Sequence, residues 1–175
     1  MSSMVLSGDT SGSITLTVPA VAGTNTATLP AATGTVMVSG NMPAFSYYQS
    51  VAQTLSSATF TKLTFTSSNF DASNGMYSSS RFTPTIAGYY QVNGSLGVGS
   101  AGTRIIPTIY KSGSILQYGN DSGPTGAVYV SSVSGIIYLN GSTDYVEIWA
   151  FFGTGQATAA SSVQTYFNAC MVRSA

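Results

Sequence analysis

Apolar and polar residues alternate along most of this chain with a period of two, which predicts β-strands, and no stretch has the period of a helix. The longest predicted strand follows a turn marked by Pro84 and Gly88. Its apolar face consists of Tyr90, Val92, Leu96 and Val98, and its other face of Tyr89, Gln91, Asn93 and Ser95. We therefore expect a core strand with one buried face, around which the rest of the chain is organised.

The stretch from Asp144 to Phe152 separates its two faces most clearly. Its aliphatic face, which we place in the core, consists of Val146, Ile148 and Ala150. Its other face is mainly aromatic and consists of Tyr145, Glu147, Trp149 and Phe151. Because an aromatic surface of this size is unfavourable in water, we predict that these four residues contact neighbouring subunits.

Further strands are predicted where the same alternation recurs between turn residues. They cover residues 45–50, 59–66, 105–111, 115–118, 127–139 and 163–173. The last of these is best explained as a strand in the middle of a sheet. About eight to ten antiparallel strands without helices predict an all-β sandwich, either immunoglobulin-like or a jelly roll.

Local signals refine this picture. Pro107 marks its strand as an edge strand or a bulged one. In 127–139 the apolar positions change face, which predicts a bulge near Ser131. The clearest turn signals are Asn74-Gly75, inside a predicted polar loop over 67–81, and Asn140-Gly141.

The first 41 residues differ in composition from the rest, so we divide the chain into 1–41 and 42–175. The first part contains a degenerate repeat, in which 17–24 recurs as 28–35, a period of eleven residues (28 − 17). The alternative is a flexible linker, but a linker would leave these alternating apolar residues exposed to water without a function. We therefore predict an extended β segment that docks on another structure. The predicted docking residues are Ile14, Leu16, Val18, Pro19, Pro30 and Val36.

Charged residues make up only 6% of the 175 residues, five basic and five acidic. No basic stripe is available to bind phosphates, so nucleic acid is not an expected partner. No apolar stretch approaches the roughly 18 residues of a membrane span, and no secretory leader is evident, so we expect neither membrane insertion nor secretion by that route. A surface with so few charges is poorly protected against association, which predicts an obligate oligomer.

The residues that supply acid–base and metal chemistry are scarce, with no histidine and one cysteine. Asp144 and Glu147 are three apart on a predicted strand, so they point to opposite faces and cannot act as a carboxylate pair. Asp71 and Asp121 form either a calcium site at a loop end or, as we favour, two solvated acids. Cys170 is expected to be a buried apolar residue rather than a reactive thiol or an intersubunit bridge. We predict no catalytic residues, no cofactor and no metal site.

Four stretches in the second part resemble the motifs of one known family in their residues, their order and their spacing. They are Phe82-Thr-Pro-Thr-Ile-Ala-Gly-Tyr-Tyr-Gln-Val92, Ile109-Tyr-Lys-Ser-Gly-Ser114, Leu139-Asn-Gly-Ser-Thr-Asp-Tyr-Val-Glu-Ile148 and Thr165-Tyr-Phe-Asn-Ala-Cys-Met-Val172. Over residues 45–173 the chain thus resembles the jelly rolls of the complement globular head and tumour necrosis factor. The resemblance implies an antiparallel jelly-roll sandwich that forms a homotrimeric knob. The chain departs from the family in its Ser142-Thr143-Asp144 turn, and nothing ahead of the knob resembles a collagen stalk or a coiled coil.

The wording of residues 11–36, from Ser-Gly-Ser-Ile-Thr-Leu to Ala-Thr-Gly-Thr-Val, resembles a segment frequent in tailed-phage fibre and other virion proteins. This resemblance implies a location on the surface of a virion assembled in the host cytoplasm. It does not distinguish the head of the particle from the tail.

Three functions follow as expectations. The first is a trimeric head-decoration or cement protein that docks on the major capsid protein, or another virion protein, through its N-terminal segment, which is too short for a fibre shaft. The second is a short tail fibre or receptor-binding protein whose loops contact a host glycan or protein. The loop residues chosen for that role are Asn69, Tyr77, Asn120 and Asp121. The third, a non-viral adhesive protein, is weakened by the absence of a leader.

Overall fold

A computed structural model of the chain describes residues 3–28, 31, 33–34, 36–99, 104–123 and 129–175. The chain forms two compact units, Met1–Gly34 and Thr35–Ala175. The boundary lies before the predicted one at residue 41 because Met37 packs against the core of the second unit. No helix in the described part of the chain is long and apolar enough to span a membrane.

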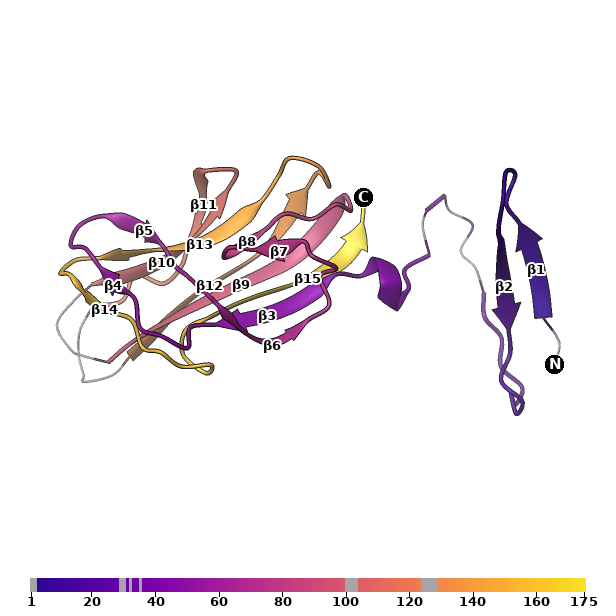
Figure 1. Ribbon diagram of the computed structural model, residues 1–175, viewed down its shortest axis with the longest axis horizontal. Coiled ribbons are helices and arrows are strands. Elements are labelled where there is room, and N and C mark those ends of the chain that lie inside the picture. Colours follow the sequence, from indigo (N-terminus) through magenta and orange to yellow (C-terminus); the bar gives the residue numbers. More distant parts are fainter. Residues whose placement is uncertain (1–2, 29–30, 32, 35, 100–103, 124–128) are drawn as a thin grey trace. The chain divides into compact units, whose positions relative to one another are not determined.

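The described part of the first unit is built on one antiparallel hairpin of β1 (Ser3–Ser7) and β2 (Ser13–Thr17), with a turn at Gly12, which has φ 79° (Figure 1). The register pairs Met4 with Leu16 and Leu6 with Ile14. Side chains directly opposite each other share a face of a hairpin, so these four residues form one apolar face. We call them the apolar hairpin face, and all four are more than half exposed.

The second unit is a sandwich of two antiparallel sheets. One sheet has the order β12-β9-β15-β3-β6. Its strands are β3 (Ala44–Tyr48), β6 (Ser67–Asp71), β9 (Gly88–Val98), β12 (Tyr129–Leu139) and β15 (Tyr166–Ser174). The last strand of the chain lies between β9 and β3, which confirms its predicted central place.

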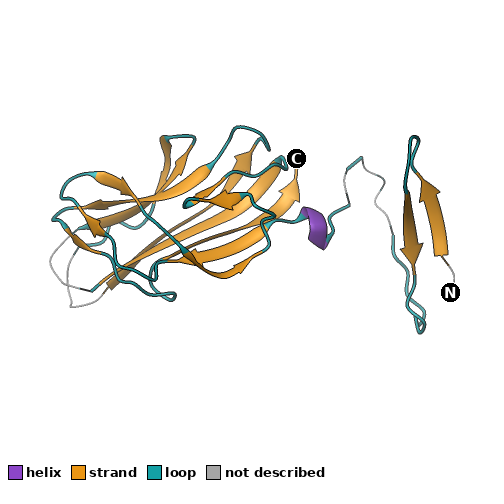
Figure 2. Ribbon diagram, viewed as in Figure 1, coloured by secondary structure: helices purple, strands orange, loops and turns teal. Residues whose placement is uncertain are grey.

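The other sheet has the order β11-β10-β13-β8-β7, with β5 also paired to β13. Its strands are β5 (Phe60–Lys62), β7 (Tyr77–Ser78), β8 (Arg81–Phe82), β10 (Ile105–Lys111), β11 (Ser114–Tyr118) and β13 (Val146–Phe152). Two short strands, β4 (Thr54–Leu55) and β14 (Gln156–Ala157), form a separate pair. Among the described residues, the one helical element is a 3-10 turn, η1 (Ser39–Asn41) (Figure 2).

The core between the sheets confirms the faces predicted from the alternation. The inward residues of β9 and β13 are completely buried, namely Tyr90, Val92, Leu96, Val98, Val146, Ile148 and Ala150. Phe45 brings β3 into this core and lies against Phe82 and Phe167, with ring centroids 5.0 Å away in both cases. The result is the all-β antiparallel jelly-roll sandwich that the sequence predicts.

The structure corrects or narrows several local predictions. β12 pairs with β9 without any register shift, so there is no bulge near Ser131. Ser131 points inward and its hydroxyl donates to the carbonyl of Asn120, while Val130 is exposed. Of the two alternatives predicted from Pro107, the edge strand is excluded because β10 lies between β11 and β13. The bulged strand is found, since the pairing of β10 with β11 shifts register between Ile109 and Tyr110.

The predicted polar loop over 67–81 in fact contributes strands β6 and β7. Its turn at Asn74-Gly75 is confirmed, with φ angles of 55° and 80°. Cys170 was expected to be buried, but it is exposed and free. Its neighbours Ala169 and Met171 occupy the inward positions of β15, so the alternation turns Cys170 outward.

Candidate functional site

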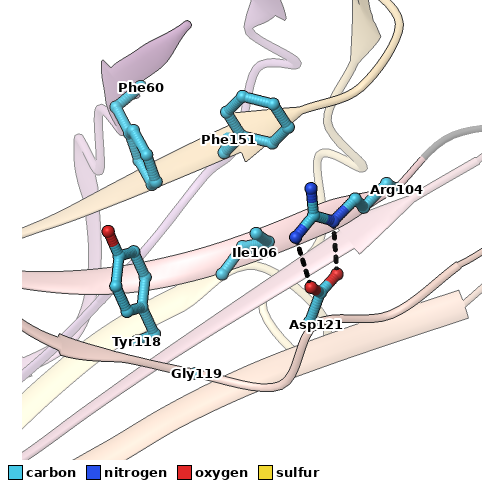
Figure 3. A pocket seen from close by; sticks show the side chains of 7 residues that line it. All are labelled: Phe60, Arg104, Ile106, Tyr118, Gly119, Asp121 and Phe151. Carbon is cyan, nitrogen blue, oxygen red and sulfur yellow. Dashed lines mark hydrogen bonds and ion pairs between the residues drawn. The ribbon is translucent and has the colours of Figure 1, made fainter. Parts of the chain in front are cut away.

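A hollow of about 350 Å³ opens on the outer face of the six-stranded sheet. We call it the aromatic pocket. Its lining residues are Phe60, Arg104, Ile106, Tyr118, Gly119, Asp121 and Phe151. They come from β5, β10, β11, β13 and the segments that flank β10 and β11. Figure 3 shows aromatic rings on one side and a charged pair on the other.

Three aromatic rings form the apolar side of the pocket. Phe60 lies directly opposite Phe151 in the β5–β13 pairing, and their ring centroids are 5.4 Å apart. Tyr118, at the end of β11, places its ring 5.9 Å from that of Phe60 and is 56% exposed. Ile106 forms the floor from the neighbouring position on β10, opposite Phe151.

The polar side of the pocket is an ion pair between Arg104 and Asp121. The guanidinium donates through Nε to Oδ1 at 2.7 Å and through Nη2 to Oδ2 at 2.5 Å. Hydrogen bonding from Arg104 lowers the pKa of the Asp121 carboxyl below its ordinary value, and Asp121 raises the pKa of Arg104 in return. The pair is therefore charged at neutral pH and has no net charge.

The segment that carries Asp121 is held by the backbone on both sides. The amide of Gly119 donates to the carbonyl of Pro107, and Ser122 bridges to Ile105. A Cβ at position 119 would meet the carbonyl oxygens of Pro107 and Ser132, so glycine is required there. This anchoring places Asp121 opposite Arg104, which directly precedes β10.

Farther along the same outer face, Glu147 is 2% exposed, and its carboxylate accepts hydrogen bonds from three side chains. Lys62 Nζ and Arg81 Nε each lie 2.8 Å from Oε1, and Trp149 Nε1 lies 2.9 Å from Oε2. Burial alone raises the pKa of Glu147, but the hydrogen bonds from Lys62, Trp149 and Arg81 outweigh it and hold the pKa below its ordinary value. We call these four residues the Glu147 cluster.

The four residues predicted to contact other subunits thus share one face, but the chain itself packs against them. The ring of Trp149 stacks on Tyr110, with centroids 4.5 Å apart. The guanidinium of Arg81 lies 3.9 Å from the ring centroid of Tyr145. Phe151 lines the aromatic pocket. The subunit contact at Tyr145, Glu147, Trp149 and Phe151 stays a prediction.

The outer face of the five-stranded sheet is less covered. Large apolar residues that are at least 38% exposed occur on β9, β12 and β15, namely Tyr89, Val130, Ile136, Tyr138 and Val172. Tyr89 and Tyr138 pair across β9 and β12 with ring centroids 5.5 Å apart. Between them and Val130 lies a hydrogen-bonded row of polar side chains, Gln91, Asn93, Ser134 and Asn168. We call this surface the β12-β9-β15 face.

The four residues predicted for receptor contact lie in different structural environments. Asp121 lines the aromatic pocket, and Asn120 is its neighbour, tied to β12 by its backbone. Asn69 is exposed, but it lies in strand β6 and donates to Ser46. Tyr77 is 7% exposed and its hydroxyl donates to the carbonyl of Phe65. Tyr77 therefore cannot present its side chain to a receptor, because the segment that holds it is a strand packed on the core.

Asp71 and Asp121 do not share a site. Asp71 accepts from the hydroxyl of Tyr47 at 2.8 Å and from the amide of Ser73 at 2.8 Å, whereas Asp121 pairs with Arg104. Burial opposes ionisation of Asp71, but the hydrogen bonds from Ser73 and Tyr47 lower its pKa. Among the described residues, no group of three or more His, Cys, Asp or Glu is placed to hold a metal ion.

Four of the six predicted docking residues lie in the hairpin or directly after it. Ile14 and Leu16 belong to the apolar hairpin face, and Val18 and Pro19 follow β2 and are exposed. Val36 is 68% exposed, and Pro30 is outside the described residues. Sequence reasoning missed the partner strand, β1, which supplies Met4 and Leu6 to the same face.

Sequence reasoning also missed the aromatic pocket. Phe60, Arg104, Tyr118 and Phe151 lie in four separate stretches of the sequence, and only the pairing of the strands brings them together. Phe151 was noticed as part of an aromatic face, but no local pattern shows which other rings stand beside it.

The sequence matches no protein-family model and no curated protein. The fold, however, is similar to those of solved structures. The globular domain of the zebrafish complement 1qA protein is 20% identical, and the match covers 76% of this chain and 99% of that one with a TM-score of 0.60. The Eiger tumour necrosis factor of S. frugiperda is 8% identical, with 77% and 95% covered and a TM-score of 0.61.

Murine APRIL, in a crystal structure at pH 5.0, is 12% identical, with 75% and 99% covered and a TM-score of 0.57. At these identities the likeness shows the fold and not the function. The second unit of the chain therefore has the jelly-roll fold of the complement globular head and tumour necrosis factor proteins.

Proposed function

From the fold of the second unit and the exposed apolar hairpin face of the first, we propose that the chain is a non-enzymatic structural protein of a phage virion. In this proposal it forms a homotrimer on the virion surface and acts as a head-decoration or cement protein. Its N-terminal unit docks on the capsid, and the jelly-roll units project from it. The observation that carries the proposal is the apolar hairpin face.

A hairpin of two strands has almost no interior of its own and is marginally stable in isolation. Here Met4, Leu6, Ile14 and Leu16 are 54%, 51%, 67% and 52% exposed. The opposite face of the hairpin carries mainly serine and threonine. One apolar face and one polar face on an isolated hairpin indicate a surface that is completed by a larger partner.

The homotrimer is supported by the fold, and the two exposed sheet faces are its candidate contacts. We place the contact on the β12-β9-β15 face. The sequence favoured the face of Trp149 because its aromatic residues would be unfavourable in water. In the structure, Tyr110, Phe60 and Arg81 cover part of that surface from within the chain. The β12-β9-β15 face has no such cover over Ile136, which is 62% exposed.

The virion assignment rests on the resemblance of residues 11–36 to segments of tailed-phage proteins. Decoration of a head is supported by the compact first unit, because the apolar face of its hairpin suits docking on a regular lattice of subunits. Under this function the protein adds contact area between capsid subunits and so opposes expansion of the lattice.

The alternative is a short tail fibre or receptor-binding protein. The observation that favours it is the aromatic pocket, because an open hollow with aromatic and charged walls is typical of ligand recognition. Both functions use the same trimer, and they differ in where the first unit docks.

The test is antibody labelling of intact particles, viewed by negative-stain electron microscopy, with an antibody against the jelly-roll unit. We expect label over the head. Label confined to the tail establishes the alternative function, and particles without label refute both.

A companion experiment asks what covers the hairpin. Particles that lack the protein are incubated with the full chain or with a variant that lacks residues 1–34. We expect the variant to remain trimeric and to lose binding. A variant that loses its trimer instead shows that the hairpins cover one another.

A further inference from the structure

We propose that the aromatic pocket binds one ring of a neutral saccharide, as a free sugar or as a residue of a surface polysaccharide. This inference deepens the receptor-binding alternative, on which its biological role rests, by naming the site and the class of ligand. The chemistry of the pocket itself depends only on described residues of the second unit.

The first argument is the shape of the apolar wall. The rings of Phe60, Tyr118 and Phe151 line one side of the hollow without filling it (Figure 3). A pyranose ring has a face of C–H bonds whose hydrogens carry partial positive charge. Such a face fits against the negative faces of aromatic rings. An amphipathic ligand of this kind is suited to a wall of rings that is partly open to water.

The second argument is the hydrogen-bonding capacity of the polar wall. The carboxylate of Asp121 offers roughly four lone-pair sites, of which the two bonds from Arg104 use two. The oxygens can therefore also accept bonds from sugar hydroxyls. On the opposite wall, beside Phe60, the hydroxyl of Tyr118 can donate or accept a further hydrogen bond (Figure 3). Because Arg104 holds the carboxylate in place, little ordering is needed when a ligand binds.

The third argument is charge, which selects a neutral ligand. Arg104 and Asp121 neutralise each other, so the pocket offers no net attraction to an anion or a cation. An acidic sugar would bring its carboxylate toward Asp121. A purely aliphatic ligand would remove water from the ion pair and return no hydrogen bond to it. Neutral polyhydroxylated ligands are favourable on both counts.

The size of the hollow suits a small ligand, such as one sugar ring. Its volume of about 350 Å³ is at the lower end of the range, roughly 300–1,000 Å³, that is usual for small-molecule sites. The pocket lies on the outer face of the six-stranded sheet, away from the β12-β9-β15 face. A trimer assembled through the latter leaves the pocket open to solvent.

The experiment is saturation-transfer-difference NMR on the purified full chain. The probes are methyl glycosides of glucose, galactose, mannose and N-acetylglucosamine, at millimolar concentration, and N-acetylneuraminic acid as an acidic probe. We expect transfer to the C–H protons of at least one neutral glycoside and none to the acid. No particle is needed, so failure of capsid docking leaves this measurement unaffected.

Four variants locate the binding. Tyr118→Ala removes an exposed ring and is expected to weaken binding about tenfold. Asp121→Asn removes the carboxylate and is expected to weaken it by a similar factor, about tenfold. The matched controls are Leu116→Ala, which is on the same strand and outside the pocket lining, and Asp9→Asn in the first unit. Both controls are expected to bind as the unchanged chain does.

Three results would overturn the proposal. They are the absence of transfer to every neutral glycoside, transfer to the acidic sugar alone, and binding that is unchanged in both Tyr118→Ala and Asp121→Asn. Tyr118 and Asp121 are at least half exposed, so loss of binding without a change in melting temperature cannot be attributed to unfolding.

Discussion

The side chain of Ile148 on β13 packs directly on Gly94 of β9, across the interior of the sandwich. A Cβ at position 94 would stand 2.8 Å from Cδ1 and 2.9 Å from Cγ2 of Ile148. Contacts this short are not tolerated between carbon atoms, so the two sheets approach each other more closely here than side chains on both strands would allow.

We therefore predict that Gly94→Ala destabilises the second unit by about 1–3 kcal/mol, because the added methyl group overpacks the core. Ile148→Val alone is expected to cost about 0.5–1.5 kcal/mol. Since it removes the closest methyl group, the double variant is expected to be more stable than the sum of the two changes predicts. Chemical denaturation with urea measures all three.

The matched control is Gly99→Ala. A Cβ at position 99 meets no atom within 4 Å, so the free energy of unfolding is expected to stay within about 0.5 kcal/mol of that of the unchanged chain. Equal stability of Gly94→Ala and Gly99→Ala would contradict the close approach of the two sheets at Ile148.

The Glu147 cluster predicts a dependence of stability on pH. The folded state lowers the pKa of Glu147 below its ordinary value of 4.5. Its contribution is therefore complete above pH 4.5 and is lost as the pH falls through the lowered value. We expect Glu147→Gln to cost about 2 kcal/mol at neutral pH, since it leaves Lys62 and Arg81 without their carboxylate.

Below pH 4.5 the stability of Glu147→Gln is expected to fall less steeply than that of the unchanged chain. Melting temperatures measured across this range test the difference. Asp121→Asn serves as the comparison, because the ion pair of Asp121 is half exposed and its removal is expected to change stability little. Parallel pH profiles for Glu147→Gln and the unchanged chain would refute the role of the cluster.

The proposed contact of the trimer predicts that Ile136→Ser weakens association about tenfold or more, because it replaces the most exposed apolar side chain of the β12-β9-β15 face with a polar one. Analytical ultracentrifugation over a range of concentrations measures the effect. Ile115→Ser is the control, since Ile115 is also an exposed isoleucine but lies on β11 of the other sheet.

Trp149→Ala separates this contact from the one that the sequence favoured. We expect it to lower the melting temperature, because Tyr110 and Glu147 lose a partner, but to leave a trimer. Dissociation in Trp149→Ala with an intact trimer in Ile136→Ser would show that subunits meet at Tyr145, Glu147, Trp149 and Phe151 instead.

The apolar hairpin face predicts a separation of docking from stability. The double change Ile14→Ser and Leu16→Ser is expected to abolish binding to particles and to leave the melting temperature of the second unit unchanged, because the two units are separate. Thr15→Ala alters the opposite face of the same strand and is expected to bind normally. Co-sedimentation with particles measures the binding. If the double variant and Thr15→Ala bind equally well, docking through this face is ruled out.

The sequence predicted the buried faces of the main strands because strand geometry itself imposes the alternation. Val146, Ile148 and Ala150 could therefore be placed in the core before any pairing was known. The same rule, applied strictly, turns Cys170 outward and Ser131 inward. Both predictions failed because hydrophobicity was allowed to override the alternation.

The aromatic pocket could not be predicted in this way. Phe60 and Phe151 become neighbours only through the β5–β13 pairing, and Arg104 meets Asp121 only because Ser122 bridges to Ile105. These contacts depend on strand pairing between distant parts of the chain. The local pattern of a single sequence does not show which strands pair. Only one strand of the hairpin was predicted, for a similar reason. The run from Met4 to Leu6 is too short to show an alternation by itself, and only its pairing with β2 places Met4 and Leu6 beside Leu16 and Ile14.

The central place of β15 also determines the order in which this protein can complete its fold during synthesis. β3 and β9 do not pair with each other, and both pair with β15, which the ribosome releases after them. Until residues 166–174 emerge, the nascent chain carries two strands with open edges and no shared neighbour. Open edges invite pairing with other chains. A ribosome that stalls before Tyr166 therefore leaves a product that is prone to aggregate, and insertion of a single strand removes both edges together.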